Sequence, residues 1–329
     1  MTASMLAATF EQTGPADLMR VREVAPPEPG PGEVRVRVRV SGVNPSDWKT
    51  RSGALGRELP GPFQIPNQDG AGVIDRVGEG VDGARVGERV WLYFAAWQSP
   101  WGTAAQWTVV PAERAVALPD GASDELGASL GIPALTAHRC LLADGSIEGR
   151  NVLVAGGAGA VGHAAIELAR WAGAHVITTV SDPEKAEIAR AAGADAVVDY
   201  RAPDAVEQVR EAAPEGVDRI VEVSLSRNLQ LDLAVAAPHA VISSYANNGG
   251  DEVAVPIRRM MLANQLLRFV FLYTMPAEAL RAAVAGVSDA VRAGALSTLP
   301  LHRFPLEQTG AAHDAVQGGA VGKVVIDVP

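Results

Sequence analysis

Residues 151–162 read NVLVAGGAGAVG, and the architecture of the chain can be worked out from this stretch. An apolar strand pattern over 151–155 runs into a glycine-rich turn, and a helical pattern continues over 162–172. Glycines in such a turn let the backbone approach a pyrophosphate closely, and the N–H groups at the helix start point at the phosphates. We therefore predict a dinucleotide site formed by Ala158, Gly159, Ala160, Val161 and Gly162. The alternative is a glycine-rich turn that binds no ligand.

The segments after this turn alternate between strand and helix patterns, which is typical of a doubly wound parallel sheet. Strands are predicted at 151–155, 175–180, 196–198, 219–223 and 240–244, and helices at 162–172 and 183–192. Before the turn, short strands punctuated by glycine and proline indicate a barrel-like or sandwich-like domain, with strands at 34–40, 72–77, 89–94, 105–110 and 114–118. The last part predicts a strand at 267–273, a helix at 276–293, and strands at 301–304 and 323–328. The fold class is therefore α/β.

Three arginines alternate with valines along the strand predicted at 34–40. A period of two places the valines on a buried face and Arg35, Arg37 and Arg39 on the other face. We expect all three arginines to lie in solvent at a sheet edge rather than to form an anion site.

The composition limits the class of protein. A length of 329 residues suits two domains, and 48% hydrophobic with 20% charged residues is ordinary for globular domains. The net charge of −10 argues against a nucleic-acid partner. The single cysteine, Cys140, excludes an internal disulfide and any multi-cysteine zinc site, and its apolar neighbours predict burial. Residues 1–10 lack the pattern of a signal peptide and no apolar run is long enough to span a membrane, so we expect a soluble, cytoplasmic protein.

The end of the second predicted strand of the parallel sheet bears on the choice of cofactor. A site that prefers NAD places a carboxylate there, but this chain has Thr178-Thr179-Val180-Ser181. Asp182 follows, yet it precedes Pro183 and is expected to cap a helix. Lys185, in the first turn of that helix, is placed to reach a 2′-phosphate, and the alternative is a solvated surface lysine. The pattern favours NADPH over NADH.

Further motifs follow one another along essentially the whole chain. They are SGVNP at 41–45, RSG at 51–53, DGAGVI at 69–74, VGERV at 86–90, GIPALTA at 131–137, the glycine loop at 157–162 and VGK at 321–323. In this order they resemble the zeta-crystallin-like quinone oxidoreductases of the medium-chain dehydrogenase/reductase superfamily. The resemblance implies a GroES-like catalytic domain at 1–125 and 274–329 around an inserted Rossmann NADPH-binding domain at 126–273, with the active site between them. It also implies a homodimer that pairs through an edge strand, here 267–273, whose apolar character suits an interface.

The resemblance assigns residues to the cofactor. Asn44 and Thr136 are implied near the nicotinamide, Ser181, Lys185 and Tyr200 around the adenosine 2′-phosphate, and Ser244, Tyr245 and Asn247 beside the nicotinamide ribose, with Phe271 and Leu272 as further cofactor contacts. Alternatives stay open for three of them. The alternative for Asn44 is that it only holds a turn. The alternative for Thr136 is that it only bonds back within its helix, and the alternative for Tyr200 is that it packs on the sheet edge.

The resemblance also bears on the metal. Zinc-dependent relatives place a cysteine where this chain has Asn44, and a histidine–glutamate pair where it has Gln68-Asp69. Asparagine and glutamine are poor zinc ligands, and a catalytic zinc needs about three Cys, His or carboxylate ligands. We therefore expect an enzyme without metal.

Two segments depart from the pattern of the family. Many relatives carry a tyrosine where this chain has Lys49, which is a point-charge donor for a substrate oxyanion. We expect the aromatic-rich segment 93–101 to line a pocket for a flat apolar substrate through Tyr93 and Trp97. The alternative is that its rings pack under a surface loop.

The reaction implied by the resemblance is hydride transfer from NADPH to a quinone or an activated alkene. Asn44 and Lys49 are the candidate catalytic residues, which stabilise charge on the substrate oxygen. One alternative is an enoyl or enal reductase, whose acyl carrier docks on Arg51, Arg57 or Arg258. Another alternative is a non-catalytic, NADPH-binding structural or RNA-associated protein.

Overall fold

The structure, a computed structural model, describes residues 4–56 and 58–329. Arg57, one of the three arginines considered for carrier docking, lies outside the described residues. The chain divides into two compact units: unit 1 comprises Met1–Ile132 and Pro300–Pro329, and unit 2 comprises Pro133–Leu299.

These unit boundaries differ from the predicted ones, which lay at 125/126 and 273/274. Helix α2 (Asp124–Gly127) packs on strand β4 (Asp69–Val77), so the chain stays in unit 1 for several residues more than expected. Helix α9 (Ala277–Arg292) packs on helix α3 (Leu135–Leu142), so this helix belongs to unit 2 and not to the returning C-terminal segment.

Unit 1 is built on a seven-stranded sheet with the order β14-β15-β3-β4-β5-β7, in which β6 pairs with β3 outside this path. Its strands are β3 (Glu33–Gly42), β4, β5 (Arg89–Leu92), β6 (Trp107–Pro111), β7 (Ala115–Ala117), β14 (Leu301–Pro305) and β15 (Lys323–Asp327). A separate antiparallel pair is formed by β1 (Met5–Thr9) and β2 (Arg20–Val24). The helices of unit 1 are α1 (Pro45–Ser52), α2 and α10 (Thr309–Gln317).

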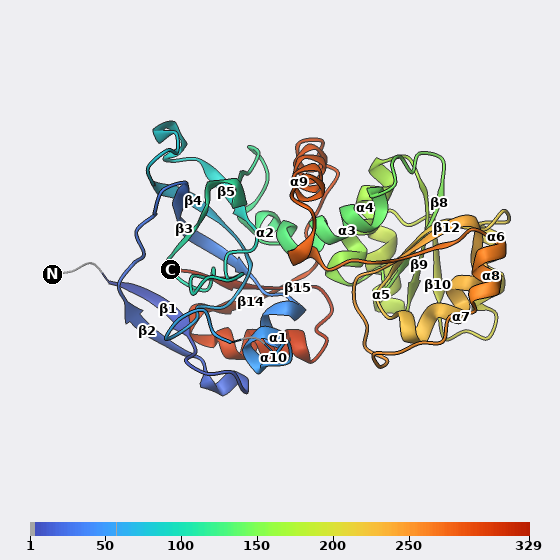
Figure 1. Ribbon diagram of the computed structural model, residues 1–329, viewed down its shortest axis with the longest axis horizontal. Helices are drawn as coiled ribbons and strands as arrows, with labels where there is room; N and C mark the ends of the chain where they lie inside the picture. The colour runs from blue at the N-terminus through green and yellow to red at the C-terminus, as the bar shows by residue number, and fades with distance from the viewer. Residues whose placement is uncertain (1–3, 57) are drawn as a thin grey trace. The chain divides into compact units, whose positions relative to one another are not determined.

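The C-terminal strands complete this sheet, and Figure 1 shows β14 and β15 within the β-rich unit formed by the N-terminal part of the chain. β15 pairs antiparallel with β3, where Val325 lies opposite Gly42, and β14 pairs parallel with β15. Val324, Val325 and Ile326 are buried, so β15 is a core strand of unit 1. The strands predicted at 301–304 and 323–328 are confirmed.

Unit 2 contains a six-stranded parallel sheet with the order β10-β9-β8-β11-β12-β13. Its strands are β8 (Asn151–Ala155), β9 (His175–Val180), β10 (Ala196–Asp199), β11 (Val217–Glu222), β12 (Ala236–Ser244) and β13 (Leu266–Phe269). Its helices are α3, α4 (Ala160–Trp171), α5 (Pro183–Ala191), α6 (Ala205–Ala212), α7 (Leu225–Val235), α8 (Ile257–Leu262) and α9.

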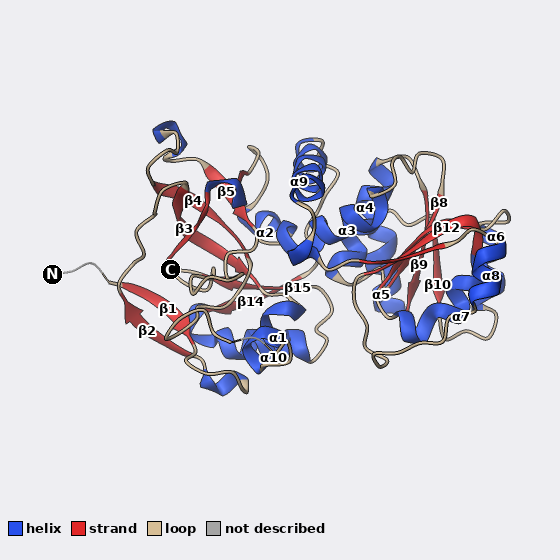
Figure 2. Cartoon of the chain, viewed as in Figure 1, coloured by secondary structure: helices blue, strands red, loops and turns tan. Residues whose placement is uncertain are grey.

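Helices cover both faces of this sheet, with α3, α4 and α5 on one side and α6 and α7 on the other (Figure 2). Strands covered on both faces become continuous apolar runs, and Val152, Leu153 and Val154 of β8 are fully buried. The doubly wound sheet and the α/β fold class are confirmed. None of the helices in the described part of the chain has both the length and the apolar character needed to cross a bilayer.

Strand β13 is shorter than predicted. The sequence indicated a strand over 267–273, but the ladder with β12 ends at the pair Ser244–Phe269, and Leu272–Thr274 form a 3₁₀ turn. Since β12 itself ends at Ser244, no neighbouring strand continues the ladder beyond this point. β13 remains the edge strand of the parallel sheet.

Arg35 does not follow the predicted pattern on β3. Arg37 and Arg39 are exposed as expected, but Arg35 is only 5% exposed. Its guanidinium contacts Asp75 on β4 through two hydrogen bonds, Nε to Oδ1 at 2.9 Å and Nη2 to Oδ2 at 2.8 Å, and it also bonds Glu28 at 2.9 Å. β3 is paired with β4 on one side and β6 on the other, so it is not the sheet edge that we expected. The hydrogen bonds that Arg35 donates to the Asp75 carboxylate raise the pKa of Arg35.

Replacing Arg35 by leucine should lower the free energy of unfolding by about 1–3 kcal/mol, because Asp75 loses two charge-assisted hydrogen bonds. Urea titration followed by circular dichroism measures this loss. Arg37→Leu is the matched control on the same strand, and it should change the free energy of unfolding by less than about 0.5 kcal/mol. Equal losses in the two variants would mean that the contact with Asp75 contributes nothing.

Candidate functional site

The turn between β8 and α4 favours glycine at three positions. A Cβ atom at Gly157 would lie 2.2 Å from the Thr178 hydroxyl on β9, and one at Gly162 would lie 2.2 Å from the carbonyl oxygen of Gly156. Gly156 has a φ of +75°, in the left-handed region that favours glycine. The N–H groups of Gly156 and Gly157 both donate to the carbonyl oxygen of Thr179, at 3.0 and 3.2 Å. The turn is therefore held close against β9.

This turn leaves the first N–H groups of α4 available to a ligand. The N–H of His163 donates to the carbonyl oxygen of Gly159 at 2.8 Å, whereas the N–H groups of Ala160, Val161 and Gly162 have no partner in the described part of the chain. Gly159, the N-cap residue, is exposed and has no side chain that could satisfy them. Free N–H groups and the helix dipole together form an anion site of the kind that suits a pyrophosphate.

The ends of β9 and β10 bring together Ser181, Lys185 and Tyr200. The two strands are parallel neighbours, and the N–H of Tyr200 donates to the carbonyl oxygen of Val180 at 3.2 Å. Lys185 Nζ donates to Ser181 Oγ at 2.7 Å. Tyr200 is 46% exposed at the end of the sheet.

Asp182 caps α5, as predicted. Its carboxylate accepts from the N–H of Lys185 at 3.0 Å, and Pro183 follows in the first turn. The same carboxylate forms an ion pair with Lys185 Nζ at 2.8 Å. These bonds from Lys185 lower the pKa of Asp182 to about 2.

Arg201 belongs to this cluster, although the sequence analysis did not single it out. Its Nη1 donates to the carbonyl oxygen of Ser181 at 2.9 Å, and its guanidinium lies 5.6 Å from the centre of the Tyr200 ring. No motif points to it, and its position directly after Tyr200 is the one signal that the sequence offers. Arg201 gives the cluster a second cation.

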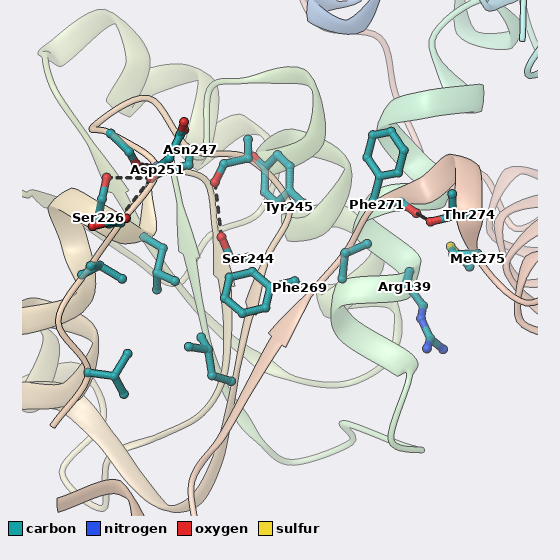
Figure 3. A pocket seen from close by; sticks show the side chains of 18 of the residues that line it. Arg139, Ser226, Ser244, Tyr245, Asn247, Asp251, Phe269, Phe271, Thr274 and Met275 are labelled. Atoms are coloured by element: carbon teal, nitrogen blue, oxygen red, sulfur yellow. Dashed lines mark hydrogen bonds between the residues drawn. The ribbon is translucent and has the colours of Figure 1, made fainter. Parts of the chain in front are cut away.

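A cavity of about 870 Å³ lies in unit 2 at the carboxyl ends of β12 and β13 (Figure 3). Its volume is within the range of small-molecule sites. Ser244, Tyr245, Asn247 and Phe271 contribute to its wall, together with Phe269, Val253, Val255 and Arg139. Leu272 and Thr136, which were also predicted to contact the cofactor, do not line this cavity: Leu272 is 4% exposed, and Thr136 on α3 is 5% exposed.

Polar contacts fix the loop that carries Tyr245 and Asn247. Asn247 Oδ1 accepts from the N–H and the hydroxyl of Ser226 at 3.1 and 2.7 Å, as Figure 3 shows. The N–H of Tyr245 donates to the carbonyl oxygen of Glu222 at 3.1 Å. Sequence reasoning missed Glu222 and Asp232, two buried carboxyl groups that interact with each other and whose pKa values are raised by burial. For Glu222, an acid directly after the apolar pair Ile220-Val221 was the available signal.

In unit 1, Asn44 is held in a buried hydrogen-bond network. Its Nδ2 donates to Asp69 Oδ2 at 2.7 Å, and its Oδ1 accepts from Lys323 Nζ at 2.9 Å. Because a lysine ammonium only donates, the amide oxygen must face Lys323 and the amide nitrogen must face Asp69. Lys323 also donates to the carbonyl oxygen of Val43 at 3.1 Å. Asn44, Asp69 and Lys323 are at most 2% exposed, so Asn44 does more than hold a turn.

Asp47 completes this network, and the sequence analysis missed it. Its carboxylate accepts from the N–H groups of Asn44 at 2.7 Å and Gln68 at 3.1 Å. Burial raises the pKa of Asp47 to about 8, and the charge of Asp69 adds to this shift. Burial also raises the pKa of Asp69, to about 6, and lowers the pKa of Lys323. The network therefore contains two buried carboxyl groups and one buried amino group.

Gln68 lies where zinc-dependent relatives carry a histidine. It is 3% exposed, and its Oε1 has no partner in the described part of the chain. Within residues 4–56 and 58–329, no three His, Cys, Asp or Glu side chains gather in a way that could hold a metal ion.

The residues predicted to contact substrate lie in different surroundings. Lys49, on α1, is partly exposed, and its Nζ lies 5.7 Å from the centre of the Trp48 ring. Tyr93 is 4% exposed, packs edge-on against Phe94 at 5.2 Å between ring centres, and donates its hydroxyl to the carbonyl oxygen of Glu113 at 3.2 Å. Burial raises the pKa of Tyr93 to about 12. Packing under a loop therefore describes Tyr93 better than substrate contact, while Trp97 is partly exposed.

Of the arginines considered for carrier docking, Arg51 is inaccessible. It is 2% exposed, and its Nη1 donates to the carbonyl oxygen of Gly14 at 2.6 Å. Arg258, on α8, is exposed. Docking of an acyl carrier on Arg51 is therefore excluded by its burial.

Comparisons with known proteins cover both units. Residues 30–120 match the family described as "Alcohol dehydrogenase GroES-like domain", and residues 160–289 match the family described as "Zinc-binding dehydrogenase". A 2-haloacrylate reductase of Burkholderia sp is 32% identical over 336 residues, which cover 98% of each chain. Human quinone oxidoreductase is 28% identical over 321 residues, which cover 96% of this chain and 95% of the relative. A mycobacterial structure solved in complex with NADPH is 30% identical with a TM-score of 0.84, covering 98% of this chain and all of the other.

The buried network should leave a pH signature in the stability of the chain. Folding raises the pKa of Asp47 and Asp69 above the ordinary value of about 4, so the folded chain holds protons that the unfolded chain has released. The contribution to stability is therefore present below pH about 4 and is lost as the pH rises through about 6 and about 8. We expect the free energy of unfolding of the original chain to fall relative to that of Asp47→Asn as the pH is raised across this range.

Urea titrations at several pH values measure this difference. Asp120→Asn, at an exposed position of unit 1, is the control and should follow the curve of the original chain. A difference between the original chain and Asp47→Asn that stays constant with pH would contradict the prediction.

Proposed function

Because the chain belongs to the zeta-crystallin-like quinone oxidoreductases of the medium-chain dehydrogenase/reductase superfamily, we propose that it is an NADPH-dependent oxidoreductase that reduces a quinone or an activated alkene. The observation that carries this proposal is the pairing of a glycine-built anion site at the start of α4 with a cationic cluster at the ends of β9 and β10. The quinone oxidoreductase and 2-haloacrylate reductase relatives support the two substrate classes.

Separate groups of residues in unit 2 are suited to bind different parts of NADPH. The free N–H groups of Ala160, Val161 and Gly162 hold the pyrophosphate, and Ser181 and Lys185 hold the 2′-phosphate at the next strand end. Ser244, Tyr245 and Asn247 line the cavity that receives the nicotinamide ribose, and Phe271 adds an apolar wall. We keep Thr136 near the nicotinamide as a proposal that rests on the family resemblance.

When bound, NADPH supplies the hydride, and negative charge develops on the substrate oxygen. Lys49 is the residue that we propose to stabilise this charge, because its ammonium is partly exposed and can move. Asn44 is oriented by Lys323 and Asp69, so its amide is fixed before the reaction begins. Water supplies the proton, since no described side chain stands out as the acid.

We propose that the enzyme works without zinc. Asn44 and Gln68 offer amide groups where a zinc site needs thiolate or imidazole ligands. The ammonium of Lys323 lies 2.9 Å from Asn44 Oδ1, so the polar atom that Asn44 offers already faces a positive charge. A metal ion at this point would be repelled by that charge.

We also propose a homodimer that forms along β13. This edge strand and the neighbouring helix α8 carry large apolar side chains in solvent: Ile257 is 67% exposed, Met261 70%, Leu262 78%, Leu266 44% and Phe269 72%. An edge strand with such a surface favours pairing with a second copy of the chain.

A cytoplasmic location is a further proposal. The chain has one cysteine, Cys140, which is buried on α3 and free. A chain without disulfides suits a reducing compartment.

The proposed reaction is tested by following NADPH oxidation with ortho-quinones, para-quinones, enals, enones and enoyl thioesters. We expect turnover with quinones or activated alkenes, and a rate that a zinc chelator leaves unchanged. Lys49→Met should lower kcat/KM about tenfold or more, and Lys49→Arg should retain part of the activity because it keeps the charge. Tight NADPH binding without turnover on any member of the panel would favour the non-catalytic alternative.

The proposed dimer is tested by sedimentation of the purified chain. Phe269→Glu should shift the protein from dimer to monomer, because it places a charge within the apolar surface. Val86→Glu, at a 50% exposed position of unit 1, is the matched control and should leave the mass unchanged. A monomeric original chain at micromolar concentration would contradict the proposal.

A further inference from the structure

The cluster at the ends of β9 and β10 contains two residues, Arg201 and Asp182, to which the proposed function assigns no contact with the cofactor. Arg201 Nη1 donates to the carbonyl oxygen of Ser181, whose hydroxyl accepts from Lys185. We propose that Arg201 is a specificity-determining residue that binds the 2′-phosphate, and that Asp182 competes with this phosphate for Lys185. This inference rests on the proposed NADPH dependence and extends it to the basis of cofactor choice.

Local backbone geometry places Arg201 next to Ser181. Asp199, the last residue of β10, accepts from the N–H of Arg201 at 2.9 Å through its Oδ1, which turns the chain back toward the neighbouring strand β9. Arg201 is exposed, and the bond to Ser181 uses one of its five N–H donors. The exposed Tyr200 ring lies beside the guanidinium. Arg201 therefore offers a planar, charged group to a phosphate from solvent.

Asp182 already occupies the place of an anion in this cluster. Its Oδ2 accepts from Ser181 Oγ at 3.0 Å and from Lys185 Nζ at 2.8 Å, and its Oδ1 accepts from the N–H of Lys185. The Lys185 and Asp182 side chains are 32% and 38% exposed, so solvent screens their attraction. A phosphate with close to two negative charges attracts the two cations more strongly than one carboxylate does.

Asp182 and Arg201 therefore favour opposite cofactors. A 2′-hydroxyl is a hydrogen-bond donor, which a carboxylate such as Asp182 accepts. A 2′-phosphate is repelled by Asp182 but attracted by Lys185 and Arg201. The chain's preference for NADPH depends on this balance, because two cations face one carboxylate.

Binding titrations of the full chain test this balance without requiring turnover. The Kd values for NADPH and NADH are measured by cofactor fluorescence, and adenosine 2′,5′-bisphosphate serves as a probe confined to this end of the site. Arg201→Gln should weaken NADPH binding about tenfold and leave NADH binding within about twofold. Asp182→Asn should strengthen NADPH binding severalfold and weaken NADH binding, while the helix stays capped because asparagine is also a good N-cap residue.

Two controls separate charge at this site from general effects. Arg190→Gln removes an exposed cation of α5 that pairs with Glu187, and it should change neither Kd. Arg201→Lys should restore part of the NADPH affinity lost in Arg201→Gln. The proposal is overturned if the ratio of the two Kd values is the same in the original chain, Arg201→Gln and Asp182→Asn. A chain that binds neither NADPH nor the bisphosphate would instead contradict the proposed function.

Discussion

Unit 1 depends on one buried ammonium group. Lys323, on the last strand of the chain, donates to Asn44 and lies against two buried carboxyl groups, Asp47 and Asp69. This cation lowers the pKa of both carboxyl groups against the effect of burial. Without it, a buried carboxylate would be an uncompensated charge, which costs several kcal/mol. β15 is therefore held by electrostatics as well as by its pairing with β3. The same contacts fix the start of α1, because Asp47 accepts from the N–H of Asn44.

Unit 2 depends instead on glycines, which have no side chain, in the turn between β8 and α4. Gly157 and Gly162 leave room for close contact between the turn, β9 and the start of α4, where the first N–H groups of the helix have no acceptor in the described part of the chain. Because the strands of the sheet are parallel, their carboxyl ends lie along one edge. The cluster around Ser181 and the cavity around Tyr245 lie at that edge, at the ends of β9–β10 and of β12–β13. The common direction of the strands thus explains why polar groups that are far apart in the sequence lie at the same edge of the sheet.

Local patterns predicted unit 2 well and long-range contacts poorly. The bounds of β8 and β9 were predicted correctly from apolar runs with clear punctuation, and the cap at Asp182 follows from Pro183. Burial of Arg35 was not predictable, because it depends on strands that pair with β3 from both sides. The contact of Arg201 with Ser181 depends on which strands are neighbours in the sheet. No local pattern reports that Lys323 meets Asn44, because these residues come from the two end segments of the chain.

The discontinuity of unit 1 has a consequence for biosynthesis. Residues 133–299 form a continuous unit and leave the ribosome before residue 300, whereas unit 1 lacks β14 and β15 until residues 301–327 are made. During that interval the segment of β3 near Gly42 has no partner on one side, and Asp69 has no ammonium beside it. The nascent N-terminal segment therefore presents an open strand edge of the kind that chaperones and wrong partners recognise. The order of synthesis makes unit 2 the part that can fold first, and unit 1 can close only after β14 and β15 have been made.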